Sequence, residues 1–285
     1  MNTLQNILKA LLVALVAILG VTSMRLVGQP DGLLTVAFLD VGQGDSVYIE
    51  TPNGFQMLVD GGGGAQVLAE LGRVMPMFDR SLDYVAATHL DKDHIGGLLS
   101  VFETMSIRQV LDTGMLPEDT VDERYYETID EYGIERQAIY RGDYIELDKE
   151  ARVSIEIFSP DLEEMDTYST NDKSLVMRLQ YGDTSIMLTG DASQKIEKKL
   201  VLLGDDLDVD ILKVGHHGSK TSSAGEFLDA TTPELVIIQA GENNRYGHPH
   251  ADVLSAFRSR DIEYLCNCTE GRIVMKSDGI IWWRE

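Results

Sequence analysis

Four potential metal ligands stand within six consecutive residues: His89, Asp91, Asp93 and His94. The apolar run at 84–88 predicts a short buried strand, and the residues from 96 to 104 are typical of a helix. Functional loops gather at strand ends of this kind. Polar groups crowded together there are costly to desolvate unless they share a partner. Histidine nitrogens and carboxylate oxygens are ordinary ligands of divalent cations, so the motif predicts a metal site.

A plainer structure also fits these four residues. In a solvated acidic loop that leads into the next helix, Asp93 would serve as the helix cap. Three later parts of the chain bear on this choice, because each places polar residues directly after an apolar run. Those residues are Asp191, the adjacent pair His216 and His217, and His248 with His250.

Each of these later residues has a structural alternative of its own. Asp191 alone would more often cap a helix than bind a metal, and the glycine and proline beside His248 are typical of an ordinary turn. Adjacent side chains point in different directions, so we expect His216 or His217 to bind metal and the other to face substrate or lie behind the ligands. Taken together, four polar strand ends favour a metal centre.

Strand and helix signals alternate twice, in a block at 33–159 that is echoed at 174–283. The expected strands are 33–40, 46–51, 55–60, 84–88, 110–111, 152–158, 174–181, 184–188, 209–214 and 235–239. The expected helices are 65–78, 96–104, 192–203 and 251–260, with 117–132 a helix or a lid and 160–172 a loop. Two similar α/β halves predict two sheets packed face to face with helices outside, as one domain over 30–285.

The charge balance limits the partners that such a domain binds. Lys plus Arg number 24 and Asp plus Glu number 47, which gives a net charge of −23. An anionic surface of that size opposes loose binding to nucleic acid or anionic lipid over the whole molecule. A polyanionic substrate would therefore have to be held by cations at the site itself.

The N-terminal segment predicts export. Residues 10–22 are apolar and uncharged, a length that fits the core of a signal peptide, and Val21 and Ser23 suit a cleavage site before Met24. Including Ile7 and Leu8 lengthens the segment, so an uncleaved anchor remains an alternative. We expect 1–29 to be a signal peptide or membrane anchor, and the protein to be secreted or tethered on the outer face of the cytoplasmic membrane.

The two cysteines, Cys266 and Cys268, lie two residues apart on one face of an expected strand. A disulfide over that separation is strained in a strand, and two thiols alone make a poor zinc site. The spacing favours packed or free thiols.

The motifs, in their order along the chain, resemble the metallo-β-lactamase superfamily, and in particular the extracytoplasmic hydrolase domain of the ComEC/Rec2 DNA-uptake proteins. The resemblance covers about 33–280 and implies an αββα sandwich with a metal site at one edge, between the sheets. The segments that carry it are Phe38–Ser46, Leu58–Gly62, Thr88–Gly97, Asn171–Val176, Leu188–Ala192, Leu212–Ser223 and Tyr246–His250.

The resemblance implies two divalent metal ions. His89 and Asp91 would bind one ion and Asp93 and His94 the other, with Asp191 between them, His216 completing a shell and His217 the less expected ligand. The implied catalytic residues are Asp93, Asp191 and His248. The implied substrate-binding residues are His217, Lys220, Asn243, Tyr246 and His248. Behind the ligands the resemblance places Asp60, which would orient them by hydrogen bonds, and Asp45, which lies with Gln43 in a loop near the site.

Two departures from the family pattern affect the expected metal. Many members have histidine where Asp91 stands, and a carboxylate oxygen makes the site harder, which favours manganese while zinc or magnesium stay possible. A third histidine of the superfamily has no counterpart here, and Asn171 or Asp172 is the nearest candidate. Four basic residues lie in or beside the motifs and would form a local cationic rim around the site: Lys92, Lys173, Lys220 and Arg245. Each of them alone is typical of a solvated surface charge.

The implied activity is metal-assisted hydrolysis of a phosphodiester, with DNA as the substrate of a nuclease. A small phosphoester or a lactone is an alternative substrate on the same fold. A second alternative is a metal-stabilised competence-accessory protein that binds without catalysis. The resemblance covers the hydrolase domain and implies hydrolysis, not transport, of DNA.

Overall fold

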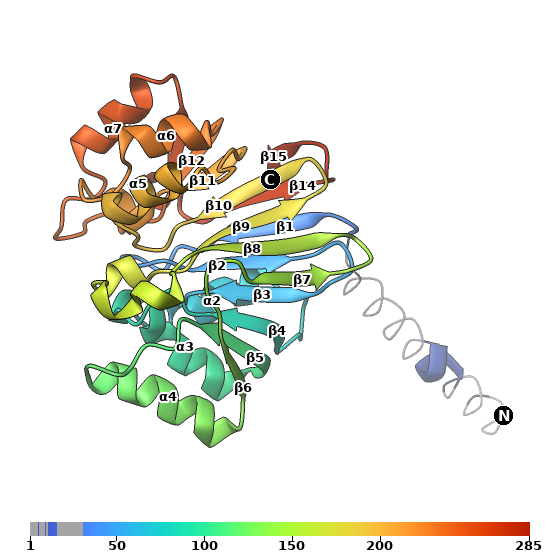
Figure 1. The fold of residues 1–285 in the computed structure, drawn as a ribbon. Helices are drawn as coiled ribbons and strands as arrows, with labels where there is room; N and C mark the ends of the chain where they lie inside the picture. The colour runs from blue at the N-terminus through green and yellow to red at the C-terminus, as the bar shows by residue number, and fades with distance from the viewer. Residues whose placement is uncertain (1–4, 6–8, 10, 16–30) are drawn as a thin grey trace.

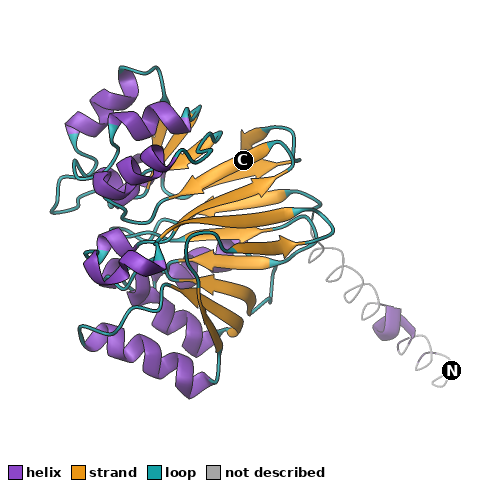
Figure 2. Ribbon diagram, viewed as in Figure 1, coloured by secondary structure: helices purple, strands orange, loops and turns teal. Residues whose placement is uncertain are grey.

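The computed structural model describes residues 5, 9, 11–15 and 31–285, and 31–285 form two β-sheets flanked by helices (Figures 1 and 2). The eight-stranded sheet has the order β15 (Trp282–Arg284), β14 (Ile273–Ser277), β1 (Leu34–Phe38), β2 (Val47–Glu50), β3 (Gln56–Val59), β4 (Ser81–Ala86), β5 (Ser106–Asp112) and β6 (Glu135–Ala138). The seven-stranded sheet has the order β13 (Glu263–Cys266), β12 (Leu235–Ile238), β11 (Ile211–Lys213), β10 (Thr184–Leu188), β9 (Val176–Tyr181), β8 (Val153–Ser159) and β7 (Tyr144–Asp148).

Six strands of the two halves correspond in order, β1 to β6 in one sheet and β8 to β13 in the other. In the first half β1, β2 and β3 are antiparallel and β3 to β6 are parallel. In the second half β8, β9 and β10 are antiparallel and β10 to β13 are parallel. The helices that connect the parallel strands are α2 (Gln66–Val74), α3 (Lys92–Thr104), α4 (Thr120–Tyr132), α5 (Gln194–Leu203), α6 (Gly225–Thr231) and α7 (Ala251–Arg258). This arrangement confirms the expected sandwich of two similar halves.

Three apolar layers hold the sandwich together. The middle layer, with Phe38, Ile155 and Leu188, lies between the two sheets. The second packs the first sheet against α2, α3 and α4, and the third packs the other sheet against α5, α6 and α7. Figure 2 shows the helices on the outer sides of the two sheets. Because the central parallel strands β3, β10, β11 and β12 are almost fully buried, they read as mostly apolar runs in the sequence.

The helix ends follow ordinary capping chemistry. The Asp119 carboxylate accepts the N–H groups of Val121 and Asp122 and starts α4, which ends at Gly133 with φ 62°. The Ser193 hydroxyl caps α5 in the same way, and Gly204 ends it. These caps satisfy backbone groups that a helix leaves unpaired. The segment 117–132, expected as a helix or a lid, is therefore a capped helix.

Some element bounds differ from the expectation. Helix α3 begins at Lys92, four residues before the expected start, so Asp93 and His94 lie in its first turn. The edge strands β6 and β7 and the short helix α6 were not expected from the sequence. The loop 160–172 contains two 3₁₀ turns, Leu162–Thr167 and Asn171–Lys173.

The expectation of free thiols is wrong. Cys266 and Cys268 form a disulfide, with their Cα atoms 5.1 Å apart. The predicted strand does not continue through both residues, because the chain turns into α8 (Asn267–Glu270) directly after Cys266. That turn brings the two sulfurs together.

The expected signal or anchor segment, 1–29, lies largely outside the described residues. Within it, residues 11–15 are helical and exposed. Among the described residues, helices that are both long and apolar enough to span a membrane are absent.

Candidate metal centre

The carboxyl ends of four parallel strands meet at one edge of the sandwich, as the connections between parallel strands require. The residues that follow these ends are Asp60 after β3, His89 after β4, Asp191 after β10, and His216 and His217 after β11. The fold thereby assembles residues from both halves of the chain. All except His216 are buried.

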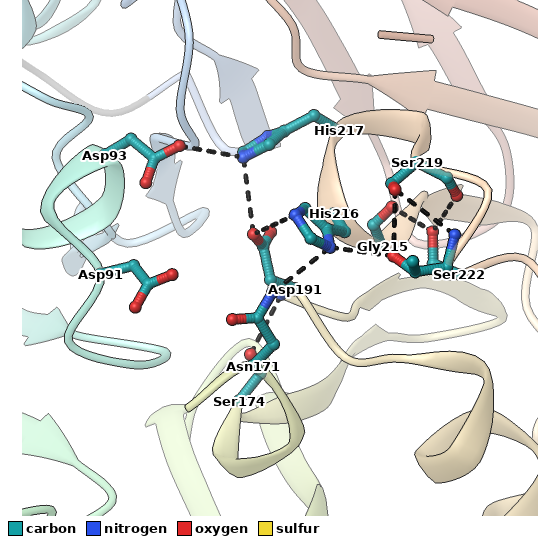
Figure 3. Close-up of polar contacts among 12 residues, drawn as sticks. Asp91, Asp93, Asn171, Ser174, Asp191, Gly215, His216, His217, Ser219 and Ser222 are labelled. Atoms are coloured by element: carbon teal, nitrogen blue, oxygen red, sulfur yellow. Dashed lines mark hydrogen bonds and ion pairs between the residues drawn. The ribbon is translucent and has the colours of Figure 1, made fainter. Parts of the chain in front are cut away.

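Asp191 lies at the centre of the group (Figure 3). Its carboxylate oxygens are 3.3 Å from Nε2 of His94 and 4.0 Å from Nε2 of His89. They are also 3.6 Å from Nε2 of His217 and 3.7 Å from Nε2 of His216. Four imidazole nitrogens therefore surround one buried carboxylate.

Two further carboxylates lie at the open side. Asp93 Oδ2 is 3.4 Å from Nε2 of His217, and Asp91 Oδ2 is 3.7 Å from Nε2 of His89. The Asp93 side chain is 35% exposed and the Asp91 side chain 42%. The Asp91 backbone precedes α3 but its carboxylate makes no capping hydrogen bond. Both carboxylates are thus available to a ligand that enters from solvent.

The start of α3 is fixed against the loop after β3 by close backbone contact. Gly61 N–H donates to the His94 carbonyl, and Gly97 N–H donates to the Gly62 carbonyl. A Cβ at Gly97 would lie 1.9 Å from the carbonyl oxygen of Gly61. Glycine is therefore required at 97 for the helix to approach closely enough to place His94 in the site.

Hydrogen bonds behind the site orient His89 and His94. The Thr88 hydroxyl donates to Asp60 Oδ2 over 2.7 Å, so its oxygen is free to accept from Nδ1 of His89 at 3.0 Å. Nδ1 of His94 lies 2.8 Å from Asp60 Oδ2 and donates to it. Because Nδ1 carries the proton in each neutral ring, the Nε2 lone pair faces the site.

His217 is oriented in the same way. Its Nδ1 is 3.0 Å from the Gln239 carbonyl oxygen and 3.2 Å from Asp45 Oδ1, both acceptors. Nε2 is left facing Asp93 and Asp191. His217, which the sequence places as the less expected ligand, is as well directed toward the cluster as His89 and His94.

The loop that carries His216 and His217 has an unusual backbone. Their φ angles are 49° and 56°, in the left-handed region that side chains other than glycine rarely adopt. The Ser222 hydroxyl donates to the carbonyls of Gly215 and Ser219 and closes the loop. Strain of this kind persists where the surroundings fix it, and it is common at functional sites.

Asn171, in the connection between β8 and β9, lies beside His216. Its Nδ2 lies 3.3 Å from Nδ1 of His216, and Figure 3 shows the amide pointing toward the cluster. The neighbouring Asp172 instead accepts a hydrogen bond from Ser193. Of the two candidates at this position, Asn171 is the one that faces the site.

A buried lysine lies behind the cluster. Lys213 Nζ donates to Asp45 Oδ2 and, over 3.2 Å, to the Gly190 carbonyl, and it is only 1% exposed. Ligand atoms of Asp45, His94, Asp191 and His217 lie within 4.8 Å of one another. Because Asp45 is already paired with Lys213 and His217, we assign it to positioning and not to metal binding.

The site strongly favours positive charge. Although burial lowers it, the pKa of His217 is raised to about 10 by Asp191 and Asp45. The pKa of His94 is raised above its usual range by Asp191 and Asp60 in the same way. Burial would raise the pKa of Asp191, but His217 and His94 hold it well below its usual range. A bound cation would take the place of the protons that these histidines otherwise carry.

Buried atoms without a partner show where a cation fits. Among the described residues, Nε2 of His89, His94 and His217 and Oδ1 of Asp191 are buried and form no hydrogen bond. Unpaired buried polar atoms are costly, and convergent imidazole and carboxylate donors are the ligand set of divalent cations. The side chains described here therefore fit one or two such ions.

A loop after β12 forms the mouth of the site. The His248 ring stacks on Tyr246 with centroids 5.6 Å apart and lies 5.7 Å from His216. Burial, with His217 and His216 nearby, lowers the pKa of His248 to about 4. Asn244 shapes the loop, accepting N–H groups of Tyr246 and His248. His248 thus faces the cluster as a neutral side chain.

A cavity of about 310 Å³ opens over the cluster. Its lining residues are Gln43, Asp91, Asp93, Asn171, Asp191, His216, His217, Tyr246 and His248. Two residues expected to bind substrate do not line it: Lys220 is exposed, and Asn243 is exposed beside Asn244.

Sequence reasoning did not single out Lys213, Asn244 or Gln239. A charged residue inside the apolar run 209–214 is a signal that a buried pair exists, since lysine is almost never buried alone. Its partner Asp45 is 168 residues away in the sequence, and only the fold brings them together.

Comparisons with known proteins agree with this geometry. The family model described as "Metallo-beta-lactamase superfamily" matches residues 39–241. ComE operon protein 3 of Bacillus subtilis is 31% identical over 255 residues, which are 84% of this chain and 32% of that protein. The chain thus spans about a third of the length of this relative.

Two solved structures share the fold. A diphosphatase of the PhnP family aligns with a TM-score of 0.50 at 13% identity, covering 86% of this chain and 98% of that one. A long-form RNase Z from yeast aligns with a TM-score of 0.50 at 12% identity, covering 83% and 41%. Fold, convergent ligands and the match over 39–241 together show that the chain belongs to the metallo-β-lactamase superfamily.

Proposed function

We propose that this protein is a metal-dependent phosphodiesterase that cleaves DNA. The observation that carries the proposal is the convergence on Asp191 of three buried Nε2 atoms that have no hydrogen-bond partner among the described residues, with Asp91 and Asp93 at the open side. The names of the RNase Z and diphosphatase neighbours favour a phosphoester as substrate.

Divalent ions held by this cluster would activate water and neutralise charge on the substrate phosphate. The oxygen-rich side formed by Asp91 and Asp93 favours manganese or magnesium over zinc, and manganese is the ion that we propose. We place His89, Asp91, Asp93, His94, Asp191, His216 and His217 around the ions.

Other side chains orient the histidine ligands or would protonate the departing group. Asp60 and Asp45 keep Nδ1 of His94 and His217 protonated, so that both rings present Nε2. His248 lies at the mouth with its Nδ1 buried and unpartnered among the described residues. It is placed to hydrogen-bond a phosphate oxygen or to assist the departing oxygen.

The test is hydrolysis by full-length protein stripped of metal and refilled with manganese, magnesium or zinc. We expect turnover of DNA with manganese, and a loss of at least about 100-fold in Asp93→Ala and Asp191→Ala, in line with the removal of a group that acts on the transition state. Lys149→Ala, an exposed residue that lines neither the cluster nor its cavity, is the control. Activity that survives both aspartate substitutions would contradict the proposal.

A small phosphoester is the second candidate. The cavity of about 310 Å³ and the net charge of −23 favour a compact substrate over a long polyanion. Side-by-side assays on plasmid, single-stranded DNA and a small chromogenic phosphodiester separate the two. Turnover of the chromogenic diester alone would replace DNA as the substrate.

We also propose that the protein is exported, with 1–29 as a signal peptide or anchor ahead of a hydrolase domain over 30–285. The uncharged apolar run at 10–22 supports this. Alkaline phosphatase fused after residue 285 should be active in a bacterial host, and deletion of 1–29 should abolish that activity. A fusion that is inactive with the segment present would contradict export.

A further inference from the structure

A second cavity, of about 460 Å³, adjoins the one over the metal cluster. The two share Gln43, Asp93 and Tyr246 in their linings. A ligand bound at the cluster would therefore lie beside the second cavity. We call the second cavity the flanking site.

The flanking site gathers cations on an acidic protein. Lys92, at the start of α3, and Arg245, in the loop after β12, both line it, although they are 153 residues apart. Within the described part of the chain, Asp93 is the one acidic residue in its lining. The chain as a whole carries a net charge of −23, so two cations beside the cluster are a local exception. They would attract a polyanion to this side of the cluster.

The flanking site also offers a planar surface. The Arg245 guanidinium lies 4.9 Å from the centroid of the Tyr246 ring and donates to the Tyr246 hydroxyl over 2.7 Å. Tyr246 is 49% exposed, and most of the cavity lining is apolar despite the two cations. Aromatic rings and guanidinium planes are the surfaces on which unpaired bases stack.

The loop that presents this surface is held in place from beneath. Asn244 donates to the carbonyls of Gly241 and His248 and accepts the N–H groups of Tyr246 and His248. Four hydrogen bonds from one side chain fix the backbone on both sides of Arg245. The surface is thus preorganised, which lowers the entropy cost of binding.

We propose that the flanking site binds the nucleotide next to the scissile phosphate, with its phosphate at Lys92 and Arg245 and its base on the Arg245–Tyr246 surface. The substrate class is then a single-stranded polynucleotide, because a base must be unpaired to stack. This proposal rests on the proposed function, which places the scissile phosphate at the metal cluster.

The first test compares KM on two substrates with the manganese-loaded full-length protein. Stacking is worth about 1–3 kcal/mol per base, which corresponds to roughly a 5- to 150-fold change in binding. We expect Arg245→Met and Tyr246→Leu each to raise KM for a single-stranded oligonucleotide about 10-fold. The increase in KM for a small chromogenic diester should be several-fold smaller. Equal increases on both substrates, or none on either, would overturn the proposal.

Arg108→Met is the matched control. Arg108 also lies over a tyrosine ring, 4.7 Å from the centroid of Tyr84, but neither residue lines the two cavities. We expect its KM values to equal those of the unaltered protein. A similar increase in Arg108→Met would mean that general stability, and not the flanking site, sets KM.

The second test measures binding without turnover, so that it separates this proposal from the proposed catalysis. A fluorescent five-nucleotide single strand is titrated into Asp191→Asn protein and into the same protein with Arg245→Met. We expect the second substitution to weaken binding at least about 5-fold and to lower the salt slope by about 0.7 for the lost phosphate contact. Such a result with no hydrolysis by unaltered protein would uphold the flanking site and refute the catalysis.

The converse result is equally decisive. Hydrolysis of DNA with single-strand binding that does not depend on Arg245 or Tyr246 would uphold the catalysis and refute the flanking site. Binding of a blunt duplex as tight as that of the single strand would refute the assignment to unpaired bases.

Discussion

At the scale of single residues, the site depends on groups that never reach the cavity. Thr88, Asp60 and Asp45 set the tautomers of three histidines, and Lys213 neutralises Asp45. Ligand candidates carry a sequence signature because they cluster at strand ends. Their supporting partners carry almost none, since a hydrogen bond between distant residues leaves no local pattern.

Lys213→Met tests the buried pair. The substitution removes the lysine ammonium group from the buried Asp45 carboxylate and leaves His217 as its charged neighbour, and breaking a buried pair in this way costs about 3–5 kcal/mol. We expect urea unfolding of metal-free protein to show a loss of that order. Lys213→Met with Asp45→Asn should recover part of it, and a single variant as stable as the unaltered protein would show that the pair contributes nothing.

Glu197 gives the folded protein a pH dependence. Burial raises the pKa of Glu197 to about 7, although Ala224 and Ser223 donate N–H groups to it and Lys198 is near. The folded state then holds this proton more tightly than the unfolded state. Its contribution to stability is full below about pH 4.5 and is lost as the pH rises through about 7.

Glu197→Gln removes this titration. We expect the melting temperature of the unaltered protein to fall relative to that of the variant between pH 5 and pH 8, measured by calorimetry in each buffer. Parallel curves across this range would contradict a raised pKa at Glu197.

At the scale of elements, the early start of α3 determines the geometry of the centre. The pair Gly96–Gly97 suggests a helix beginning there, because glycine is uncommon inside helices. The structure instead has glycine inside the helix, where it allows contact with the loop after β3. The sequence thus identifies residues that the fold brings together but misplaces the element that carries Asp93 and His94.

Gly97→Ala tests this close contact. Overpacking of a tight contact costs about 1–3 kcal/mol, and the shift of α3 would move His94 away from Asp191, so we expect lower stability and weaker metal binding. Gly72→Ala in α2 is the matched control, because a Cβ there meets nothing within 4 Å. It should stabilise the protein by about 0.5–1 kcal/mol, and equal effects of the two would refute a special role for Gly97.

Other elements escaped prediction for physical reasons. β6 has the sequence Glu135-Arg-Gln-Ala138, and such a polar edge strand has no apolar periodicity to detect. The disulfide between Cys266 and Cys268 depends on the single turn of α8. The four residues of that turn, Asn267–Glu270, carry no sequence pattern that predicts a helix. By contrast β10, β11 and β12 were predicted well, because these almost fully buried strands are mostly apolar.

At the scale of the whole molecule, the centre joins the two halves of the chain. His89 and His94 come from the first half, and Asp191 and His217 from the second. Repetition of the α/β pattern predicts this joint edge, because equivalent strand ends meet when two sheets pack face to face. The repeated α/β pattern does not determine the substrate. The acidic surface disfavours a polyanion, whereas Lys92 and Arg245 beside the cluster favour one.

Metal removal should loosen the entire sandwich. A ligand that binds only the folded state at 100 times its Kd stabilises that state by about 2.7 kcal/mol. We expect chelation to lower the melting temperature by several degrees, reversibly on return of manganese. A melting temperature that is the same with and without chelator would contradict a metal that bridges the halves.

The most direct measurement is the number of divalent ions bound by dialysed full-length protein, determined by titration calorimetry together with elemental analysis. We expect two equivalents of manganese per chain, falling to one or none in Asp191→Ala, with circular dichroism showing that the variant is folded. Absence of binding by the unaltered protein, or unchanged binding in Asp191→Ala, would contradict a metal centre built around Asp191.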